Sequence, residues 1–232
     1  MAQEAPGAGP GAPAGAGPGA RAAALVRWPD CGRAWVALMR HVLAAAEPAD
    51  DDRGPVLESP PALFEITAFP AADPVLSRFA EPGKAALYAR KFTENTVVPP
   101  FKYSYGGRLR ELRGVDQLAW VTGLLAARPY SKSGWISLTV PGEDPTAVPC
   151  LAAAAFRRRR GSLLVSAIFR SQNAFTAHLN YLPLRDVQAQ VAGRLAVPCG
   201  PMRVYIDVPH VYVADVHDVH AIVDAIPAPE PM

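Results

Sequence analysis

The positions of apolar residues along the chain follow two periods, which predict its helices and strands. A spacing of three and four residues, as between Trp35, Leu38 and Val42, is typical of one face of an amphipathic helix. This spacing predicts helices over residues 30–47, 84–92, 116–128, 183–199 and 219–226. Alternation of apolar and polar residues predicts strands over residues 63–69 and 204–208. Residues 135–140 also read as a strand, and residues 151–156 and 162–170 look like two more strands separated by a turn at Gly161.

Aspartate, proline and glycine mark where several of these elements begin and end. Asp30 and Asp116 stand where a side chain caps the first turn of a helix. Pro183 stands where a first helical turn tolerates proline, and Gly200 marks the end of that helix. Residues 48–61 are rich in Pro and Asp, so we expect a loop there.

The composition divides the chain into two parts. Residues 5–20 contain only Ala, Gly and Pro, which offer nothing to bury. We therefore expect residues 1–24 to be a disordered tail and residues 25–232 to form a single domain. Because the predicted strands cluster between residues 135 and 213, the pattern indicates an α+β fold with helices packed on a sheet.

The charge balance argues against a polyanionic partner. The chain has 23 basic and 21 acidic residues, a formal net charge of +2, so no overall field favours nucleic acid or an anionic membrane. Arg157–Arg160 is the one basic cluster, and a turn at Gly161 would leave it at an exposed corner. No aromatic residues interleave with it, so we interpret it as a solvated turn rather than a nucleic-acid site.

Cysteine usage and hydropathy point to a reducing compartment. The three cysteines form no CxxC pair and cannot all pair within one chain, which favours the cytoplasm. No run approaches the ~20 apolar residues that span a bilayer, so we expect no contact with a membrane. His217 and His220 lie near acidic residues but lack a compact set of ligands, so we expect no metal site.

Cys150 is the candidate for chemistry, whereas Cys31 and Cys199 are expected to be packed side chains. It follows Pro149 in a predicted turn between two strands, and the second strand of the next pair ends in Arg170-Ser171-Gln172-Asn173. An arginine beside polar residues and free amides makes a good phosphate site, because its guanidinium offers a bidentate fork. Its charge would also favour a thiolate nearby.

An ordered set of short motifs surrounds this cysteine between residues 103 and 216. The set comprises Tyr105-Gly106-Gly107-Arg108-Leu109-Arg110, Asp116-Gln117, Pro149-Cys150, Arg170-Ser171-Gln172-Asn173, Asn180 and His210-Val211-Tyr212. In its order and spacing, this set resembles the thymidylate synthases and their relatives that hydroxymethylate pyrimidine nucleotides. The resemblance implies a thymidylate synthase-like α+β fold, with helices packed on a mixed sheet.

The resemblance also implies a reaction. Cys150 would add to C6 of a pyrimidine nucleoside monophosphate, making C5 a nucleophile toward the one-carbon unit of 5,10-methylenetetrahydrofolate. Arg170 and Ser171, helped by Arg53, would hold the phosphate. The implied nucleotide-binding residues are Arg53, Arg170, Ser171, Asn173, Asn180, His210 and Tyr212, with Asn180 at the base and His210 and Tyr212 at the ribose.

The family is dimeric, and a partner chain lends two arginines to the phosphate. The corresponding stretch of this sequence offers Lys132, which keeps the charge but loses the fork. We therefore expect a homodimer in which Lys132 contacts the phosphate bound by the other chain.

Three departures from the family separate the hypotheses. The family's catalytic glutamate, in a Glu-x-x-Trp-Phe element, has no counterpart in Lys84–Arg90, and Asn173 replaces an aspartate on the folate side. The sequence also ends about twenty residues after Tyr212, so we expect a divergent, truncated member. The hypotheses are a methyl- or hydroxymethyltransferase, a catalytically degenerate nucleotide-binding protein or partner subunit, and a partner-binding protein. Sequence leaves uracil or cytosine, and ribose or deoxyribose, open.

Overall fold

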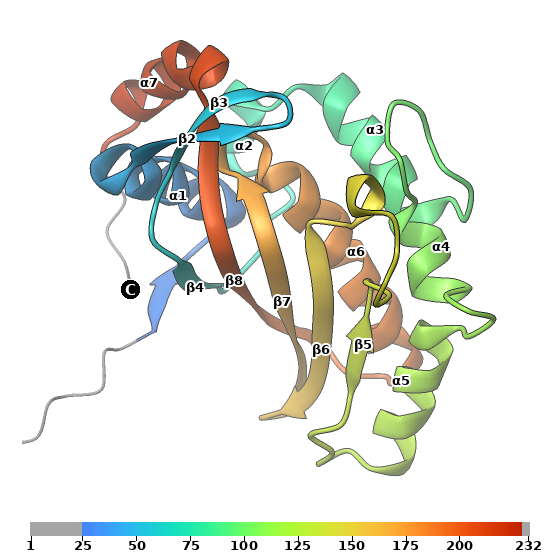
Figure 1. Ribbon diagram of the computed structural model, residues 1–232. Coiled ribbons are helices and arrows are strands. Elements are labelled where there is room, and N and C mark those ends of the chain that lie inside the picture. The colour runs from blue at the N-terminus through green and yellow to red at the C-terminus, as the bar shows by residue number, and fades with distance from the viewer. Residues whose placement is uncertain (1–24, 229–232) are drawn as a thin grey trace, which may run out of the picture.

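Three long strands form the middle of the structure, a computed structural model that describes residues 25–228 (Figure 1). They are β6 (Leu151–Arg159), β7 (Ser162–Asn173) and β8 (Cys199–Tyr212). β6 runs antiparallel to β7, and β7 runs parallel to β8, so the sheet is mixed as the sequence predicts. The predicted disordered tail, residues 1–24, lies outside the described residues.

Shorter strands complete an eight-stranded sheet in which the main path has the order β1-β4-β8-β7-β6-β5. β2 and β3 form a hairpin, and β3 pairs with the carboxyl end of β8. The bounds are β1 Val26–Trp28, β2 Glu47–Asp51, β3 Gly54–Glu58, β4 Ala62–Ile66 and β5 Trp135–Ser137.

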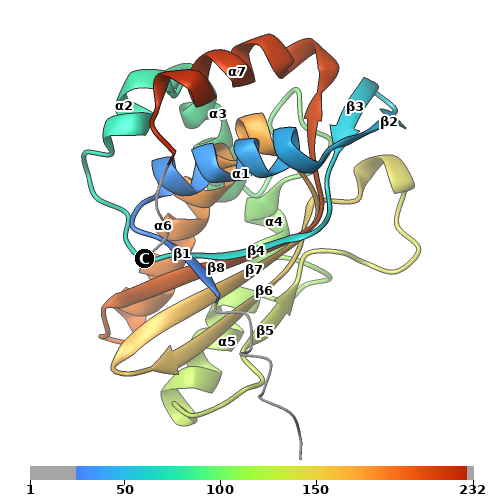
Figure 2. The same ribbon diagram turned by 90° about the vertical axis from the view of Figure 1, so that its left-hand side faces the viewer.

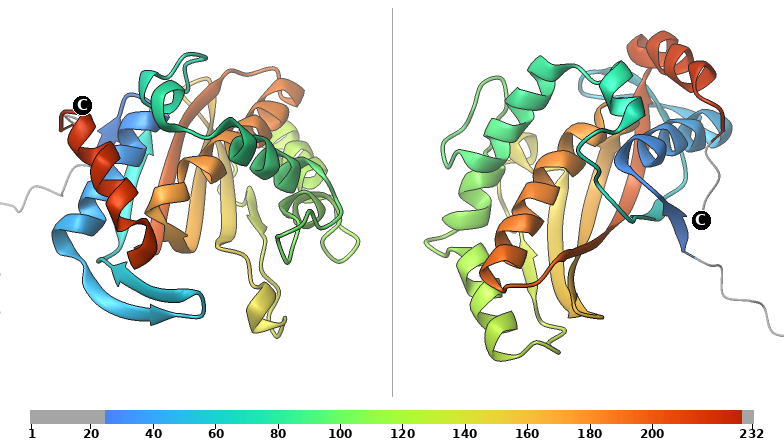
Figure 3. Two further views of the ribbon diagram at one scale, coloured as in Figure 1. Left: turned by 90° about the horizontal axis from the view of Figure 1, so that it is seen from above. Right: turned by 180° about the vertical axis from the view of Figure 1, so that it is seen from behind.

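The helices cover one face of this sheet (Figure 3). α6 and α1 pack on its middle, while α3, α4 and α5 follow one side. The bounds are α1 Cys31–Ala45, α2 Pro74–Phe79, α3 Pro82–Thr93, α4 Tyr105–Arg110, α5 Gln117–Ala127, α6 His178–Arg194 and α7 Val216–Ala225. None of these helices is both long enough and apolar enough to cross a lipid bilayer.

The first helix forms where the sequence predicts it. Asp30 caps α1 by accepting a hydrogen bond from the backbone N–H of Arg33, 2.8 Å away. Trp35 and Met39 on its apolar face are fully buried, and such side chains each stabilise the fold by about 1.5–3 kcal/mol. The indole N–H of Trp35 donates to the carbonyl of Ala174, so this helix is tied to the end of β7.

The core lies between the sheet and α6. Alternate residues of β7, among them Val165 and Phe169, are buried beneath this helix, as a strand covered on one face requires. Tyr181 of α6 packs edge-on against both Phe169 and Phe64. These contacts hold the carboxyl end of β7 in one position, and that end carries candidate site residues.

The opposite face of the sheet carries no helix (Figure 2). Leu63 in β4 and Trp135 in β5 are 56% and 47% exposed, and both belong to strands that point alternate side chains to this face. Glu65 is also on this face, where it pairs with Arg27 and Arg203 at 2.7 and 2.8 Å. An exposed face with large apolar side chains is typical of a surface that another chain covers.

Several boundaries differ from the prediction. Residues 48–61 are not a loop but contain most of the hairpin of β2 and β3, because pairing with β8 overrides the weak strand propensity of Pro and Asp. Gly54, with a φ of 121°, makes the sharp turn between the two strands. Arg157–Arg159 belong to β6, and the turn follows them at Gly161.

The helix predicted around Pro183 begins earlier and ends earlier. α6 starts at His178, directly after a short 3₁₀ turn, so Pro183 lies inside the helix rather than in its first turn. Pro183 itself is buried there with Leu184, and this tertiary packing offsets the missing N–H. The helix ends at Arg194, and Gly200 lies in β8.

Candidate active site

The motifs that stand apart in the sequence come together at one end of the sheet (Figure 1). β7 and β8 are parallel, so their carboxyl ends lie side by side, with Asn173 opposite His210. β6 is antiparallel and begins at the same end, where Leu151 pairs with Phe169. Cys150, which precedes β6, therefore lies beside the polar ends of β7 and β8.

Cys150 is fixed by its backbone on both sides. Its N–H donates to the phenolic oxygen of Tyr103 at 3.3 Å, and its carbonyl accepts from the N–H of Arg170 at 2.9 Å. The hydroxyl of Ser171 lies 3.8 Å from the half-buried Sγ. The thiolate is the form in which cysteine acts as a nucleophile, and this hydroxyl is placed to donate to it.

Arg170 holds the loop that carries the cysteine. Its Nε donates to the carbonyl of Pro149 at 3.2 Å, and its Nη2 donates to the carbonyl of Val148 at 3.0 Å. A guanidinium has five N–H donors, so these two bonds leave further donors for an anion. Arg170 can thus order the Cys150 loop and bind a phosphate at the same time.

His210 is a neutral, oriented imidazole. It is 8% exposed, and burial lowers its pKa, which keeps it uncharged at pH 7. Its Nδ1 lies 3.3 Å from the carbonyl of Val208, which can only accept, so Nδ1 carries the proton and Nε2 is left as an acceptor. An acceptor of this kind suits a sugar hydroxyl.

Tyr212 and Arg53 meet at the hairpin of β2 and β3. The Tyr212 hydroxyl donates to Asp51 at 2.9 Å, and burial together with this carboxylate raises the pKa of Tyr212 to about 12. Val56 pairs with Tyr212 across the sheet, which places the hairpin turn beside the end of β8. Arg53, exposed in that turn, donates its N–H to the same Asp51 at 3.0 Å.

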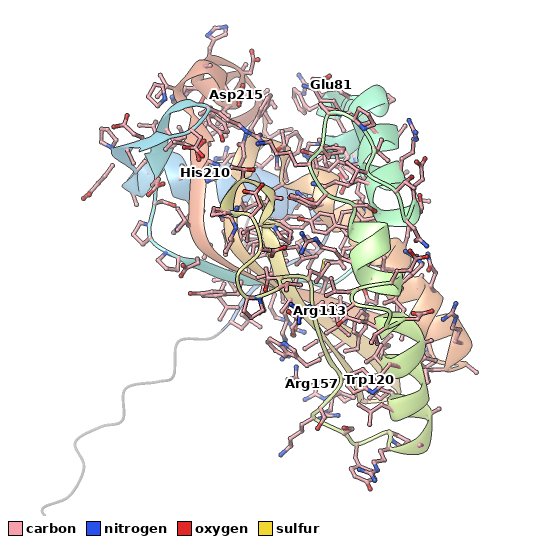
Figure 4. The ribbon with its side chains drawn as sticks, turned by 45° about the vertical axis from the view of Figure 1, so that its right-hand side comes forward. Glu81, Arg113, Trp120, Arg157, His210 and Asp215 are labelled. Atoms are coloured by element: carbon pink, nitrogen blue, oxygen red, sulfur yellow. The ribbon has the colours of Figure 1, made fainter. Side chains whose placement is uncertain are left out.

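Asn173 and Asn180 have structural partners. Asn173 accepts from the N–H of Phe175 at 2.9 Å and lies 3.5 Å from the carboxylate of Asp215, so a carboxylate stands beside the amide that replaces the expected acid. Figure 4 shows Asp215 and His210 at the same end of the molecule. Asn180, buried in the first turn of α6, lies 3.5 Å from Oε1 of Gln172.

Lys132 does not join this site within one chain. It precedes β5, whose first residue, Trp135, pairs with Ala155 well down the length of β6. The lysine therefore lies toward the other end of the sheet. Arg157 lies toward that end too, far from His210 in Figure 4.

Four side chains near Cys150 have no role in the site expected from the sequence: Tyr88, Lys91, Tyr103 and Tyr105. The Tyr105 hydroxyl accepts a hydrogen bond from the N–H of Leu151 at 3.0 Å, next to the hydrogen bond from the N–H of Cys150 to Tyr103. Tyr88 and Lys91 lie in α3, whose residues Lys84–Arg90 include no glutamate.

The described residues offer no obvious metal centre, since no three His, Cys, Asp or Glu side chains of residues 25–228 gather as ligands.

Comparison with known proteins points to one family. No protein-family model matches the sequence. Proteins named "Putative thymidylate synthase" from Methanosarcina acetivorans and Methanosarcina barkeri are 26% and 25% identical over 207 residues, which cover 87% of this chain and 95% of theirs. A protein of the same name from Methanopyrus kandleri is 32% identical over 122 residues, 51% of this chain and 58% of its own. The chain is thus similar, at low identity, to archaeal proteins of this name.

Proposed function

We propose that the protein transfers a one-carbon unit, methyl or hydroxymethyl, to C5 of a pyrimidine nucleoside monophosphate through a covalent adduct at Cys150. The convergence of Cys150, Arg170 and His210 from three strands at one end of the sheet carries this proposal. A nucleophile, an anion-binding guanidinium and a hydrogen-bond acceptor suit the base, the phosphate and the ribose of a nucleotide, respectively.

The nucleotide would bind through its phosphate first. Arg170 and Ser171 offer a guanidinium and a hydroxyl beside the thiol, and Arg53 adds a second guanidinium from the hairpin turn. The free Nε2 of His210 accepts from the ribose hydroxyl, and Tyr212 supports it. Asn180 reads the polar edge of the base, since an amide can donate and accept at once.

The reaction then follows from the position of the thiolate. The Cys150 sulfur bonds to C6, the C5–C6 double bond opens, and C5 forms the new carbon–carbon bond. The proton on C5 leaves, the sulfur–C6 bond breaks, and the thiolate is restored. 5,10-Methylenetetrahydrofolate would supply the carbon, and the bond between this carbon and the folate nitrogen would break. For methylation the tetrahydrofolate would also supply a hydride and leave as dihydrofolate, whereas for hydroxymethylation water would add and tetrahydrofolate would leave. On its side of the site Asp215, beside Asn173, offers a carboxylate that suits the amino group of a pterin.

A second copy of the chain would cover the helix-free face of the sheet. Leu63 and Trp135 leave apolar area on this face that a partner would bury. In such a homodimer Lys132, which is remote from the site of its own chain, becomes available to the phosphate in the other chain.

One observation favours a second candidate, a nucleotide-binding protein or partner subunit without carbon transfer. Lys84–Arg90, the nearest counterpart of the family's glutamate helix, contains no carboxylate, and its one weakly acidic side chain is Tyr88. Loss of a general acid or base lowers a rate by roughly 100-fold or more. A tyrosine with a pKa raised by burial is a poor base at pH 7. This candidate keeps the binding residues and predicts affinity without turnover.

The experiment that separates the two candidates uses a 5-fluoropyrimidine nucleotide. A transferase incubated with 5-fluoro-dUMP or 5-fluoro-UMP and methylenetetrahydrofolate should gain the mass of both molecules, because fluorine cannot leave C5 as a cation. The Cys150→Ala variant is the matched control and should remain unmodified. An unchanged mass of the wild-type protein with every nucleotide tested would contradict the transferase.

Tritium release from C5 then identifies the substrate. dUMP, UMP, dCMP and CMP labelled at C5 are compared with and without folate, and the nucleotide that loses tritium fixes both the base and the sugar. Stabilisation against thermal unfolding by a nucleotide, with no tritium release from any of the four, is the outcome expected of the degenerate candidate.

A further inference from the structure

Lys91 in α3 is buried in a cage of aromatic rings. It is 5% exposed, and its Nζ lies 4.2 Å from the ring centres of Phe101 and Tyr103, 4.5 Å from that of Tyr105 and 5.6 Å from that of Tyr88. Cation–π attraction of this kind is worth about 2 kcal/mol when the cation is desolvated. The cage therefore tolerates a positive charge where an apolar pocket would reject it.

No acid partners this lysine. Among the ion pairs and side-chain hydrogen bonds of residues 25–228, none includes the Lys91 amino group. A buried ammonium without a carboxylate is costly to the fold. Packing alone does not require a lysine here, since methionine or leucine would fill the same cage.

Two tyrosines of the cage also contact the backbone at Cys150. Tyr103 and Tyr105, which contact the ammonium through their rings, use their hydroxyls to hold the N–H groups of Cys150 and Leu151 at 3.3 and 3.0 Å. The same two tyrosines thus contact the Lys91 ammonium and the backbone that carries the Cys150 thiol. Tyr105 is fully buried and Lys91 is 5% exposed, and electrostatic coupling is stronger in a buried environment than in water.

The titration of Lys91 agrees with this coupling. Burial lowers its pKa to about 8, a negative charge on Cys150 acts in the opposite direction, and Arg53 lowers the pKa further. The ammonium is therefore the main form at pH 7 and loses its proton as the pH rises through 8. The titratable and charged groups around it are Tyr88, Tyr103 and Tyr105 of the cage, Cys150, and Arg53 of the hairpin turn.

We propose that Lys91 is a positioning residue whose caged ammonium stabilises the thiolate of Cys150. It supplies, from the helix that lacks the glutamate, the charge that prepares the nucleophile before substrate binds. The proposal rests on the proposed function only in taking Cys150 as the nucleophile. It requires no nucleotide and no folate, so it can be tested apart from them.

The test measures how fast iodoacetamide alkylates Cys150, a step in which the sulfur–carbon bond forms and iodide leaves. Peptide mass spectrometry separates Cys150 from the buried Cys31 and from Cys199. Lys91→Met removes the charge and keeps an unbranched side chain in the cage. We expect it to slow alkylation at pH 7 by about 10-fold. Lys91→Arg should restore most of the rate.

Two further comparisons separate charge from structure. Lys84→Met, which removes an exposed lysine from the same helix, should alkylate like the wild-type protein. The ratio of wild-type to Lys91→Met rates should fall toward one above pH 9, because the wild-type lysine is then neutral. Equal rates at pH 7, or a ratio that does not change with pH, would overturn the proposal.

A reciprocal measurement covers the case in which Lys91→Met does not fold. In protein labelled with ¹³C at the lysine Cε, NMR follows the titration of Lys91 directly. Replacing Cys150 by Ser removes the negative charge, so the Lys91 pKa should fall relative to the wild-type protein. An unchanged titration would show that the two groups are not coupled. Either result stands whether or not the protein binds a nucleotide.

Discussion

The N–H of Cys150 donates a hydrogen bond to the hydroxyl of Tyr103, 3.3 Å away, and the next amide, of Leu151, donates to Tyr105 at 3.0 Å. Tyr103, just before α4, and Tyr105, its first residue, thus hold two consecutive amides at the start of β6. Because β6 begins at these amides, the position of the thiol depends on a segment that precedes it by more than forty residues.

Tyr105→Phe should destabilise the protein. Tyr105 is fully buried, so loss of its hydroxyl leaves the N–H of Leu151 without a partner, at an expected cost of about 1–3 kcal/mol in the free energy of unfolding. Urea unfolding followed by circular dichroism measures the change. Tyr130→Phe, at a tyrosine that is 77% exposed, is the matched control and should change stability by less than about 0.5 kcal/mol. Equal stabilities of the two variants would contradict this assignment.

Arg170→Lys should weaken nucleotide binding nearly as much as Arg170→Ala. Lysine keeps the charge, but its single amino group cannot donate to the carbonyls of Val148 and Pro149 and also offer a bidentate fork to a phosphate. We expect both variants to lose affinity for the nucleotide by about 10-fold or more, measured by calorimetry. Arg128→Ala, at an exposed helix end, should bind normally. Full affinity of Arg170→Lys would mean that charge alone suffices.

His178 should make the protein sensitive to acid. It is 4% exposed, and neither ring nitrogen has a hydrogen-bond partner among the described residues. Burial, with a smaller effect from Lys84, lowers its pKa to about 4. Between pH 6.5 and 4 the unfolded chain binds a proton that the folded protein does not, so stability falls as the pH falls through this window, by up to about 3 kcal/mol.

His178→Leu should remove this part of the pH dependence. The free energy of unfolding, measured in urea at intervals from pH 7.5 to 4.5, should fall less steeply for the variant than for the wild-type protein. His217→Ala, at an exposed histidine, should keep the wild-type slope. A slope that His178→Leu leaves unchanged would place the acid sensitivity elsewhere.

Gly106→Ala and Gly123→Ala should change stability in opposite directions. A Cβ at Gly106 would lie 2.2 Å from the carbonyl oxygen of Glu94, so α4 would have to move, at a cost of about 1–3 kcal/mol. At Gly123, inside α5, no atom lies within 4 Å of the added Cβ, and the gain in helix propensity should stabilise by about 0.5–1 kcal/mol. Thermal unfolding compares the two, and a neutral Gly106→Ala would mean that α4 has room to shift.

Leu63→Lys should disrupt the proposed homodimer. The side chain is 56% exposed on the helix-free face, so the substitution should change the stability of a single chain by no more than about 0.5 kcal/mol. A charge placed in an apolar contact between two copies should instead produce monomers in sedimentation velocity. Val115→Lys, at another exposed apolar residue, is the control. A wild-type protein that sediments as a monomer would contradict the homodimer.

Local patterns in the sequence account for much of the fold. The stripe of α1, the caps at Asp30 and Asp116 and the alternation in β7 and β8 each concern residues a few positions apart, where side-chain direction follows the backbone period. The boundaries that the sequence misplaces, as at Pro183 and in residues 48–61, are those where tertiary packing or strand pairing outweighs local propensity.

For the candidate site, the sequence by itself determined the order of the motifs around Cys150, from Arg170 to Tyr212, and their resemblance to one family. Only the tertiary structure decided that Lys91 of α3 lies against the rings of Tyr103 and Tyr105, whose hydroxyls contact the backbone at Cys150. Their convergence depends on how α3 and α4 pack against α6 and the sheet. Such packing is set by buried contacts between residues far apart in the chain, which no local period records.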